Sequence, residues 1–105
     1  MKKFEIFAET VNEFMTDAAS LFTEVFIAHG EQTIDLESYK NCTDAYYTVQ
    51  DACLGFEDSK VSDDELIELF DQAILRLTGV NNMYGNSARD LYSATRNELL
   101  SIVNA

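Results

Sequence analysis

Residues 3–29 read KFEIFAETVNEFMTDAASLFTEVFIAH, and their apolar side chains predict a long amphipathic α-helix. The apolar positions recur at alternating spacings of three and four residues, which places them on one face of a helix. They are Phe4, Phe7, Val11, Phe14, Ala18, Leu21 and Val25. At 1.5 Å per residue this helix would be about 40 Å long, which is long for a small domain. We therefore expect part of it to project from the fold or to pack against another copy.

Two further segments follow with the same period and with recognisable first residues. A second helix is predicted over residues 35–54, and Asp35 is its expected N-cap because an Asp side chain accepts a hydrogen bond from a free backbone N–H. A third helix begins at Ser62-Asp63-Asp64-Glu65. This sequence is a capping box, in which Ser62 and Glu65 each bond to the backbone of the other.

Glycines and polar residues indicate where the helices end. Gly30, Gly55 and Gly79 each follow an apolar run, at the place where helices often end with a left-handed residue. Residues 80–86 are rich in Asn and Gly and predict a loop, after which Ser87 opens a fourth helix. We see no alternation long enough for a strand. The sequence therefore predicts one domain over residues 1–105 that is all-α, a four-helix bundle built from two antiparallel helical hairpins.

The charge of the chain is strongly one-sided. Nineteen Asp and Glu residues stand against seven Lys and Arg, which gives a formal net charge of −12. Residues 31–71 alone hold twelve of the acids and two lysines. A hydrophobic content of 47% is too high for a disordered acidic tail. Such a field repels nucleic acid and anionic membranes and attracts basic protein surfaces, so we expect neither direct nucleic-acid binding nor membrane binding.

The acids are also arranged in rows along the predicted helices. On the first helix they recur every four residues, which places them on one face about 6 Å apart. On the second they recur every seven residues, and several more crowd around the start of the third. A solvated helix face usually mixes signs, so rows of one sign favour a recognition role. The residues predicted to contact a partner are Glu5, Glu9, Glu13, Asp17, Asp44, Asp51, Asp58, Asp63, Asp64 and Glu68.

This pattern favours a non-enzymatic binding protein that imitates a nucleic-acid backbone. Its acids would occupy a basic, nucleic-acid-binding surface of a partner protein and inhibit it, as phage or mobile-element inhibitors do. The match is coarse, because a DNA strand presents one phosphate per 3.4 Å whereas the tighter row offers one carboxylate per roughly 6 Å. A basic groove could still accept such rows and release its counterions.

A second hypothesis is a helical adaptor or a homodimeric structural module. In that case the long first helix and the apolar residues 99–103 would dock another chain, and the acids would only keep the protein in solution. Tyr47 and Tyr84 are predicted to be exposed, the first beside the apolar stripe and the second in the loop over residues 80–86. Exposed tyrosines are good anchors for an interface.

Residue types that carry chemistry are sparse. Cys42 and Cys53 lie eleven residues apart on the apolar stripe of the second helix, so they would be roughly 16 Å apart and could not form a disulfide. Two free buried thiols fit a reducing cytoplasm. His29 stands at a helix end, where it complements the helix dipole. The acids of residues 58–69 fail the calcium-binding loop pattern, because Asp63 occupies the position that requires glycine. We therefore expect no catalytic residue, no metal and no cofactor.

The stretch Leu54-Gly55-Phe56-Glu57-Asp58-Ser59 resembles the attachment motif of acyl carrier proteins, which are also small, acidic and four-helical. The resemblance covers about six residues and implies that Ser59 would carry phosphopantetheine. The chain departs from the family pattern in two places. Lys60 follows the serine where the family has leucine, and one extra residue separates Gly55 from Asp58. The stronger helix cap is Ser62, so these residues also fit a loop before a capped helix.

Overall fold

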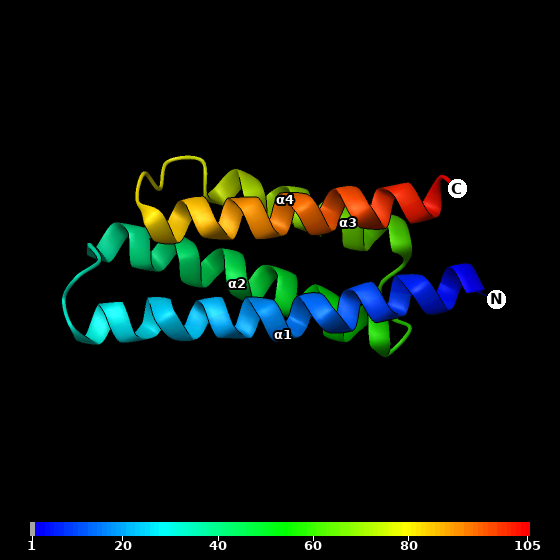
Figure 1. Ribbon diagram of the computed structural model, residues 1–105, viewed down its shortest axis with the longest axis horizontal. Helices are drawn as coiled ribbons and strands as arrows, with labels where there is room; N and C mark the ends of the chain where they lie inside the picture. Colours follow the sequence, from blue (N-terminus) through cyan, green and yellow to red (C-terminus); the bar gives the residue numbers. More distant parts are fainter. Residues whose placement is uncertain (1) are drawn as a thin grey trace.

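The computed structural model describes residues 2–105 and confirms an all-helical bundle. Its helices are α1 (Lys2–Gly30), α2 (Leu36–Glu57), α3 (Asp63–Arg76) and α4 (Met83–Val103). Figure 1 shows two antiparallel hairpins, α1 with α2 and α3 with α4, stacked side by side. Each helix packs against the next along the chain, and α4 closes the ring by packing against α1. The bundle measures 46 × 20 × 19 Å, so its long axis is set by α1.

The apolar stripe of α1 faces the bundle along almost its whole length. Its buried residues begin at Phe7 and continue to Ala28, so the expected projection is limited to the first turn. At the centre the ring of Phe14 lies 4.7 Å from that of Phe70 and 5.5 Å from that of Tyr92, measured between centroids. Phe70 and Leu66 of α3 are fully buried. One core therefore joins α1, α3 and α4 around these aromatic rings.

The predicted starts of α2 and α3 are confirmed. The Asp35 carboxylate accepts a hydrogen bond from the backbone N–H of Ser38 at 2.9 Å. Ser62 Oγ accepts from the N–H of Glu65 at 3.2 Å, and the Glu65 carboxylate accepts from the N–H of Ser62 at 3.1 Å. These backbone hydrogen bonds lower the pKa of Asp35 and of Glu65 below their ordinary values, because they stabilise the charged form.

The predicted start of α4 is wrong by four residues. The helix begins at Met83, where the Asn82 side chain accepts a hydrogen bond from the N–H of Gly85 at 3.0 Å. Most of the expected loop after Val80 therefore belongs to the helix, and Ser87 lies inside it. Gly85 is buried, and a side chain at this position would collide with Val80. Tyr84 is consequently half-buried against the core and is not the exposed loop residue that was expected.

The helix ends also differ from the glycine pattern. The left-handed residues are Gln32 and Ser59, both with φ of 61°, and no described glycine has a positive φ. Gly55 lies inside α2, which continues to Glu57. The backbone N–H of Lys60 bonds to the carbonyl of Gly55 at 2.8 Å, a closure typical of a helix whose next residue is left-handed. Ser59 has taken the place in the turn that the sequence pattern gave to glycine.

Candidate functional site

All ten acids predicted to contact a partner are exposed, in α1, α2, α3 or the loop that joins α2 to α3. Nine of them form no ion pair with the side chains of residues 3–105, and the exception is Asp44. The accessibility that a binding role requires is therefore present. The remaining question is how these carboxylates are arranged relative to one another.

The acids of α1 form a continuous row that winds around the helix. Four residues turn an α-helix by about 400°, so each acid lies about 40° further round than the one before it. Asp17 lies seven residues after Thr10 and therefore on nearly the same side of α1. Thr10 Oγ1 is 3.5 Å from Glu98 Oε1 of α4. The row thus begins at Glu5 on the outer side of α1 and ends at Asp17 on the side that faces α4.

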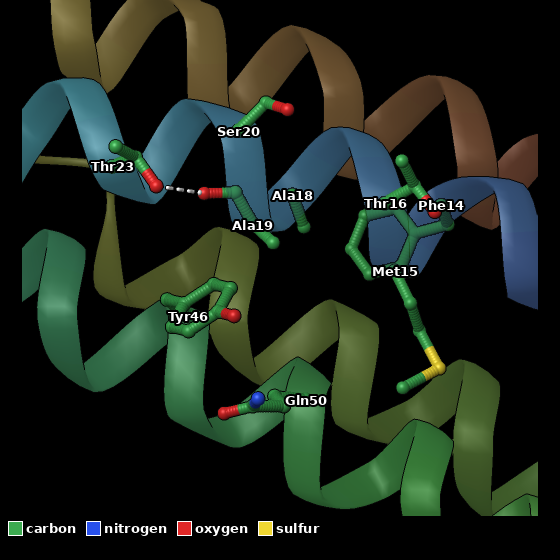
Figure 2. Close-up of a pocket in the computed structure, with 9 residues that line it drawn as sticks. All are labelled: Phe14, Met15, Thr16, Ala18, Ala19, Ser20, Thr23, Tyr46 and Gln50. Atoms are coloured by element: carbon green, nitrogen blue, oxygen red, sulfur yellow. Dashed lines mark hydrogen bonds between the residues drawn. The ribbon is translucent and has the colours of Figure 1, made fainter.

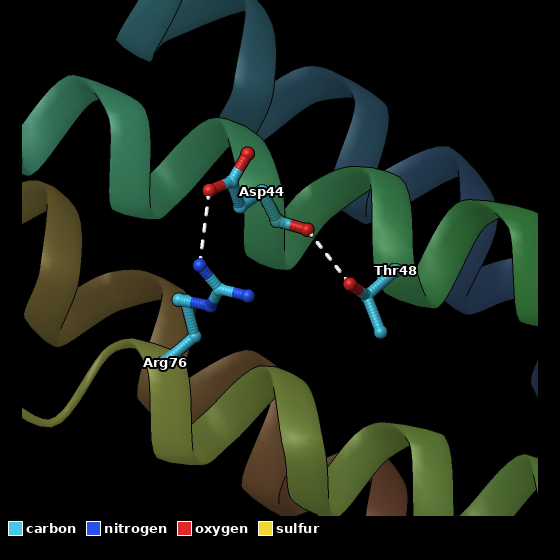
Figure 3. A network of polar contacts seen from close by, with 3 residues as sticks. All are labelled: Asp44, Thr48 and Arg76. Carbon is cyan, nitrogen blue, oxygen red and sulfur yellow. Dashed lines mark hydrogen bonds and ion pairs between the residues drawn. The ribbon is translucent and has the colours of Figure 1, made fainter.

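The acids of α2 lie on the other side of the α1/α2 hairpin. Arg76 of α3 donates to Asp44 at 3.1 Å, and Thr48 Oγ1 donates to the backbone carbonyl of Asp44 at 2.8 Å (Figure 3). Asp51 lies seven residues after Asp44 and so shares the side that faces α3. The row on α1 turns toward α4 whereas the row on α2 turns toward α3. The structure therefore does not bring the ten acids onto one face.

The three arginines all lie on α3 and α4, and each is engaged in polar contacts. Arg96 donates to Asp71 at 2.9 Å, and Arg76 pairs with Asp44. Arg89 donates to the backbone carbonyls of Leu77 and Val80, the latter at 2.8 Å, and also to Asn86. The Leu77 carbonyl stands at the end of α3 and the Val80 carbonyl in the loop after it. Arg89 of α4 therefore links α4 to the end of α3. The row on α1 consequently receives no arginine.

A groove runs along the seam between α1 and α2, which we call the α1/α2 groove. It contains two hollows, of about 530 Å³ and about 410 Å³. The larger is lined by Met15, Ala18 and Ala19 from α1 and by Tyr46 and Gln50 from α2, as Figure 2 shows. The smaller is lined mainly by Phe4, Ala8, Asn12, Phe56, Glu57 and Val61. The alanines that line these hollows all belong to α1, and their side chains are too short to fill the seam.

Aromatic rings pack across the seam at both ends of the groove. Phe22 of α1 stacks on Tyr46 of α2 with centroids 4.4 Å apart, and Tyr47 covers the pair at 5.8 Å from Phe22. At the other end Phe4 and Phe7 contact Phe56, at 6.3 and 5.0 Å. Beyond Phe22, His29 stacks on Tyr39 at 3.9 Å. The ring of His29 therefore packs against α2 as well as standing in the last turn of α1.

Several large apolar side chains of the groove remain exposed, and the sequence reasoning missed most of them. Phe4 is 65% exposed although its spacing placed it on the core stripe. It stands between two open hollows, one that it shares with Phe56 and one that it shares with Ile102 and Val103. Tyr47 is 49% exposed, as predicted. Leu54 is 44% exposed and lies one turn after Gln50, so it belongs to the same wall of the groove.

The two cysteines are free and buried, as their place on the stripe predicts. Burial raises the pKa of Cys53 to about 12, with a smaller contribution from the charge of Glu57. Burial also raises the pKa of Cys42. At neutral pH both residues are thus thiols, a form that is a poor nucleophile.

No group of three or more His, Cys, Asp or Glu side chains within residues 2–105 is placed to hold a metal ion. Over the same residues, no helix combines the length and the apolar character that crossing a bilayer requires. Ser59 is exposed in the loop after α2, three residues before the Ser62 cap. No model of a known protein family matches this chain, and comparisons with curated proteins and with solved structures found no significant match.

Proposed function

We propose that this protein is a non-enzymatic binding protein whose acidic row on α1 occupies a basic, nucleic-acid-binding surface of a partner protein and inhibits it. The contact row is Glu5, Glu9, Glu13 and Asp17. The acids of α2 turn toward α3, and Asp63 at the start of α3 lines a hollow beside Lys3 and Phe4 of α1. In this proposal the acids outside the row add to the negative field. The field draws the basic partner in, and the row sets where it binds.

One observation carries the proposal. The four carboxylates of the row are exposed at a regular spacing, and none of them forms an ion pair among residues 3–105. Like charges four residues apart weaken a helix by a few tenths of a kcal/mol per pair. No Lys or Arg stands four residues after any of these acids to relieve the repulsion, and the three arginines lie on α3 and α4. A binding role accounts for the uncompensated row.

Two features of the chain agree with the proposal without testing it. Free, buried cysteines suit a reducing cytoplasm, where a nucleic-acid enzyme would be met. An inhibitor of this size and composition is also typical of phages and mobile elements, and that source belongs to the proposal.

The experiment is affinity capture from a cell lysate with three immobilised forms of the protein. The row variant carries Glu5→Gln, Glu9→Gln, Glu13→Gln and Asp17→Asn. A matched control removes the same number of charges elsewhere, with Glu24→Gln, Glu31→Gln, Glu37→Gln and Asp90→Asn, all at exposed positions. Bound proteins are eluted with duplex DNA and, separately, with NaCl.

We expect the wild-type protein and the control to capture the same basic proteins, duplex DNA to release them, and the row variant to retain less than about a tenth as much. A captured protein should then bind labelled DNA more weakly when the wild-type protein is added. Equal losses in the row variant and in the control would show that only the amount of charge matters. That result, or capture that DNA cannot reverse, contradicts the proposal.

The adaptor hypothesis has less support because its docking segment is used inside the bundle. Leu99 is fully buried, and Leu100, Ile102 and Val103 pack against the core. Much of the apolar run at residues 99–103 is therefore used inside the bundle. Ile102 and Val103 also line an open hollow beside Phe4, and that hollow is the surface left to an adaptor role.

A further inference from the structure

The α1/α2 groove exposes apolar surface that the fold itself leaves uncovered. Phe4 lines its smaller hollow, Tyr47 packs beside Phe22 and Tyr46 at the larger one, and Leu54 lies one turn after Gln50. The two hollows lie along successive turns of α1. Contiguous exposed apolar surface with a polar rim is typical of an interaction site. The hollows are open and lined by Ala8, Ala19 and Met15, so a side chain from outside could enter between the two helices.

The length of the groove fits a helix. Along α1 it extends from Phe4 to Phe22, which is about 27 Å at 1.5 Å per residue. A partner helix of about 18 residues, or five turns, covers that distance. An amphipathic helix placed in a groove between two helices inserts apolar side chains at spacings of three and four residues.

The charges around the groove select a basic partner. Glu57 lines the smaller hollow itself, and Glu5 and Glu9 directly follow the groove residues Phe4 and Ala8 in α1. Asp58 follows Glu57, and the cations at this end are Lys60 in the adjoining loop and Lys3, which precedes Phe4. The opposite end of the groove, at Phe22 and Tyr46, is aromatic. The groove is thus acidic at one end and apolar at the other.

A second copy of the chain fits this groove poorly. Each copy carries a formal charge of −12, so two copies would bring their acidic ends together. Like charges opposed across an interface cost several kcal/mol. Nucleic acid and anionic lipid are repelled for the same reason.

We propose that the α1/α2 groove binds a cationic amphipathic helix of a partner protein. The apolar stripe of that helix would enter the hollows between Tyr47 and Leu54 on one wall and Met15 and Ala19 on the other. Its Lys and Arg residues would lie at the Glu57 end. This inference deepens the proposed function, because it names the chemistry of the basic partner. It rests on that function only if the inhibited partner is also the protein that supplies the helix.

The probe is a synthetic 18-residue peptide of leucine and lysine with one tryptophan, designed as an amphipathic helix with its lysines weighted to one end. A second peptide has the same composition in a shuffled order that has no apolar stripe. The chain contains no tryptophan, so the emission of the peptide reports binding without background. Both peptides are titrated at low and at physiological salt.

Two triple variants test where the peptide binds. The groove variant carries Phe4→Ala, Tyr47→Ala and Leu54→Ala. The matched control carries Ile27→Ala, Leu75→Ala and Met83→Ala, three equally exposed apolar residues on other surfaces. All six side chains are largely exposed, so both variants should remain folded, which circular dichroism verifies.

We expect the amphipathic peptide to bind at least tenfold more tightly than the shuffled one, with a blue-shifted emission. The groove variant should lose at least tenfold in affinity for it, and the control variant less than twofold. Equal binding of the two peptides, or equal affinities of the two variants, would overturn the proposal that the groove binds such a helix. Concentration-dependent dimers of the wild-type protein that the groove variant abolishes would also overturn it, because a second copy would then be the occupant.

The two proposals can fail separately. If the row variant captures as much as the wild-type protein from the lysate while the groove variant loses the peptide, the groove stands and the inhibitory function falls. If the peptide result fails while DNA still releases captured proteins, the groove falls and the function stands.

Discussion

The two hairpins of this bundle are built differently. In the α3/α4 hairpin Arg89 donates to the carbonyls of Leu77 and Val80, and Arg96 pairs with Asp71. Gly85 lets the start of α4 approach Val80 closely. In the α1/α2 hairpin the seam is held by aromatic pairs such as Phe22 with Tyr46, and it is hollow between them. Polar links close one hairpin, and the other remains open.

This difference separates stability from recognition. The arginines neutralise or cap groups in α3 and α4, and they also anchor α2 through Asp44. The row on α1 and the α1/α2 groove are left with free carboxylates and uncovered apolar side chains. A surface that satisfies its own charges and fills its own gaps offers a partner little. We therefore infer that the α3/α4 hairpin supports the fold and that α1 and α2 carry the binding surfaces.

The largest effect should come from the same substitution made in each hairpin. Leu77→Ala removes a fully buried side chain at the end of α3 and should lower the free energy of unfolding by about 2–5 kcal/mol. Leu54→Ala removes a half-exposed side chain of the groove and should cost less than about 1 kcal/mol. Urea unfolding followed by circular dichroism measures both. Similar losses would mean that the groove is part of the core.

A smaller effect is expected from the arginines. Arg89→Met removes a charged donor from two backbone carbonyls and should cost about 2 kcal/mol, because hydrogen bonds to charged groups are worth about 1.5–3 kcal/mol. Arg76→Met breaks only an exposed ion pair with Asp44, for which we expect less than about 1 kcal/mol. The same urea assay compares them. A larger loss for Arg76→Met than for Arg89→Met would mean that the main polar link of the bundle joins α2 to α3 and not α3 to α4.

Removing the cap of α3 should lower the free energy of unfolding by less than Leu77→Ala or Arg89→Met does. Ser62→Ala removes the acceptor for the N–H of Glu65 and should cost about 1 kcal/mol. Ser101→Ala, at an exposed position inside α4, serves as the control and should be nearly neutral. A cost for Ser62→Ala no larger than that of the control would show that the capping box does not support the hairpin.

The same capping box predicts a pH dependence. The pKa of Glu65 is lowered by its hydrogen bond to the backbone of Ser62. A carboxyl with a lowered folded pKa stabilises the fold above its ordinary pKa, near 4.3, and loses that contribution as the pH falls through the folded value. The stability difference between the wild-type protein and Glu65→Gln should therefore shrink as the pH falls below about 4. Unfolding curves at pH 7 and at lower pH measure it, and a difference that grows on acidification would contradict the assignment.

Much of the fold could be predicted because the signals are local. The stripe on α1, the Asp35 cap and the Ser62–Glu65 capping box each depend on residues within a few positions of one another. The start of α4 could not be predicted in the same way. Asn82 and Gly85 are typical of loops, yet Asn82 caps the helix and Gly85 is a packing position because Val80 lies against it.

The candidate site was predicted less well. Spacing correctly indicated that the acids are exposed, but it could not show which neighbouring helix each side of α1 or α2 would face. That depends on the order of helices around the bundle, and it separates Asp17 from Asp51. The groove has a similar cause. Phe4 fits the apolar period of α1 and is nevertheless exposed between two open hollows, a fact that no local pattern contains.

The comparison of the two hairpins is tested most sharply by mapping where a cationic amphipathic helix binds. The peptide probe would be titrated into ¹⁵N-labelled wild-type protein, and amide shifts would be followed by two-dimensional NMR. We expect the largest shifts at Ala8, Ala19, Gln50 and Leu54, while Arg89 and Thr95 change little. Shifts spread evenly over all four helices, or largest in α3 and α4, would contradict this expectation.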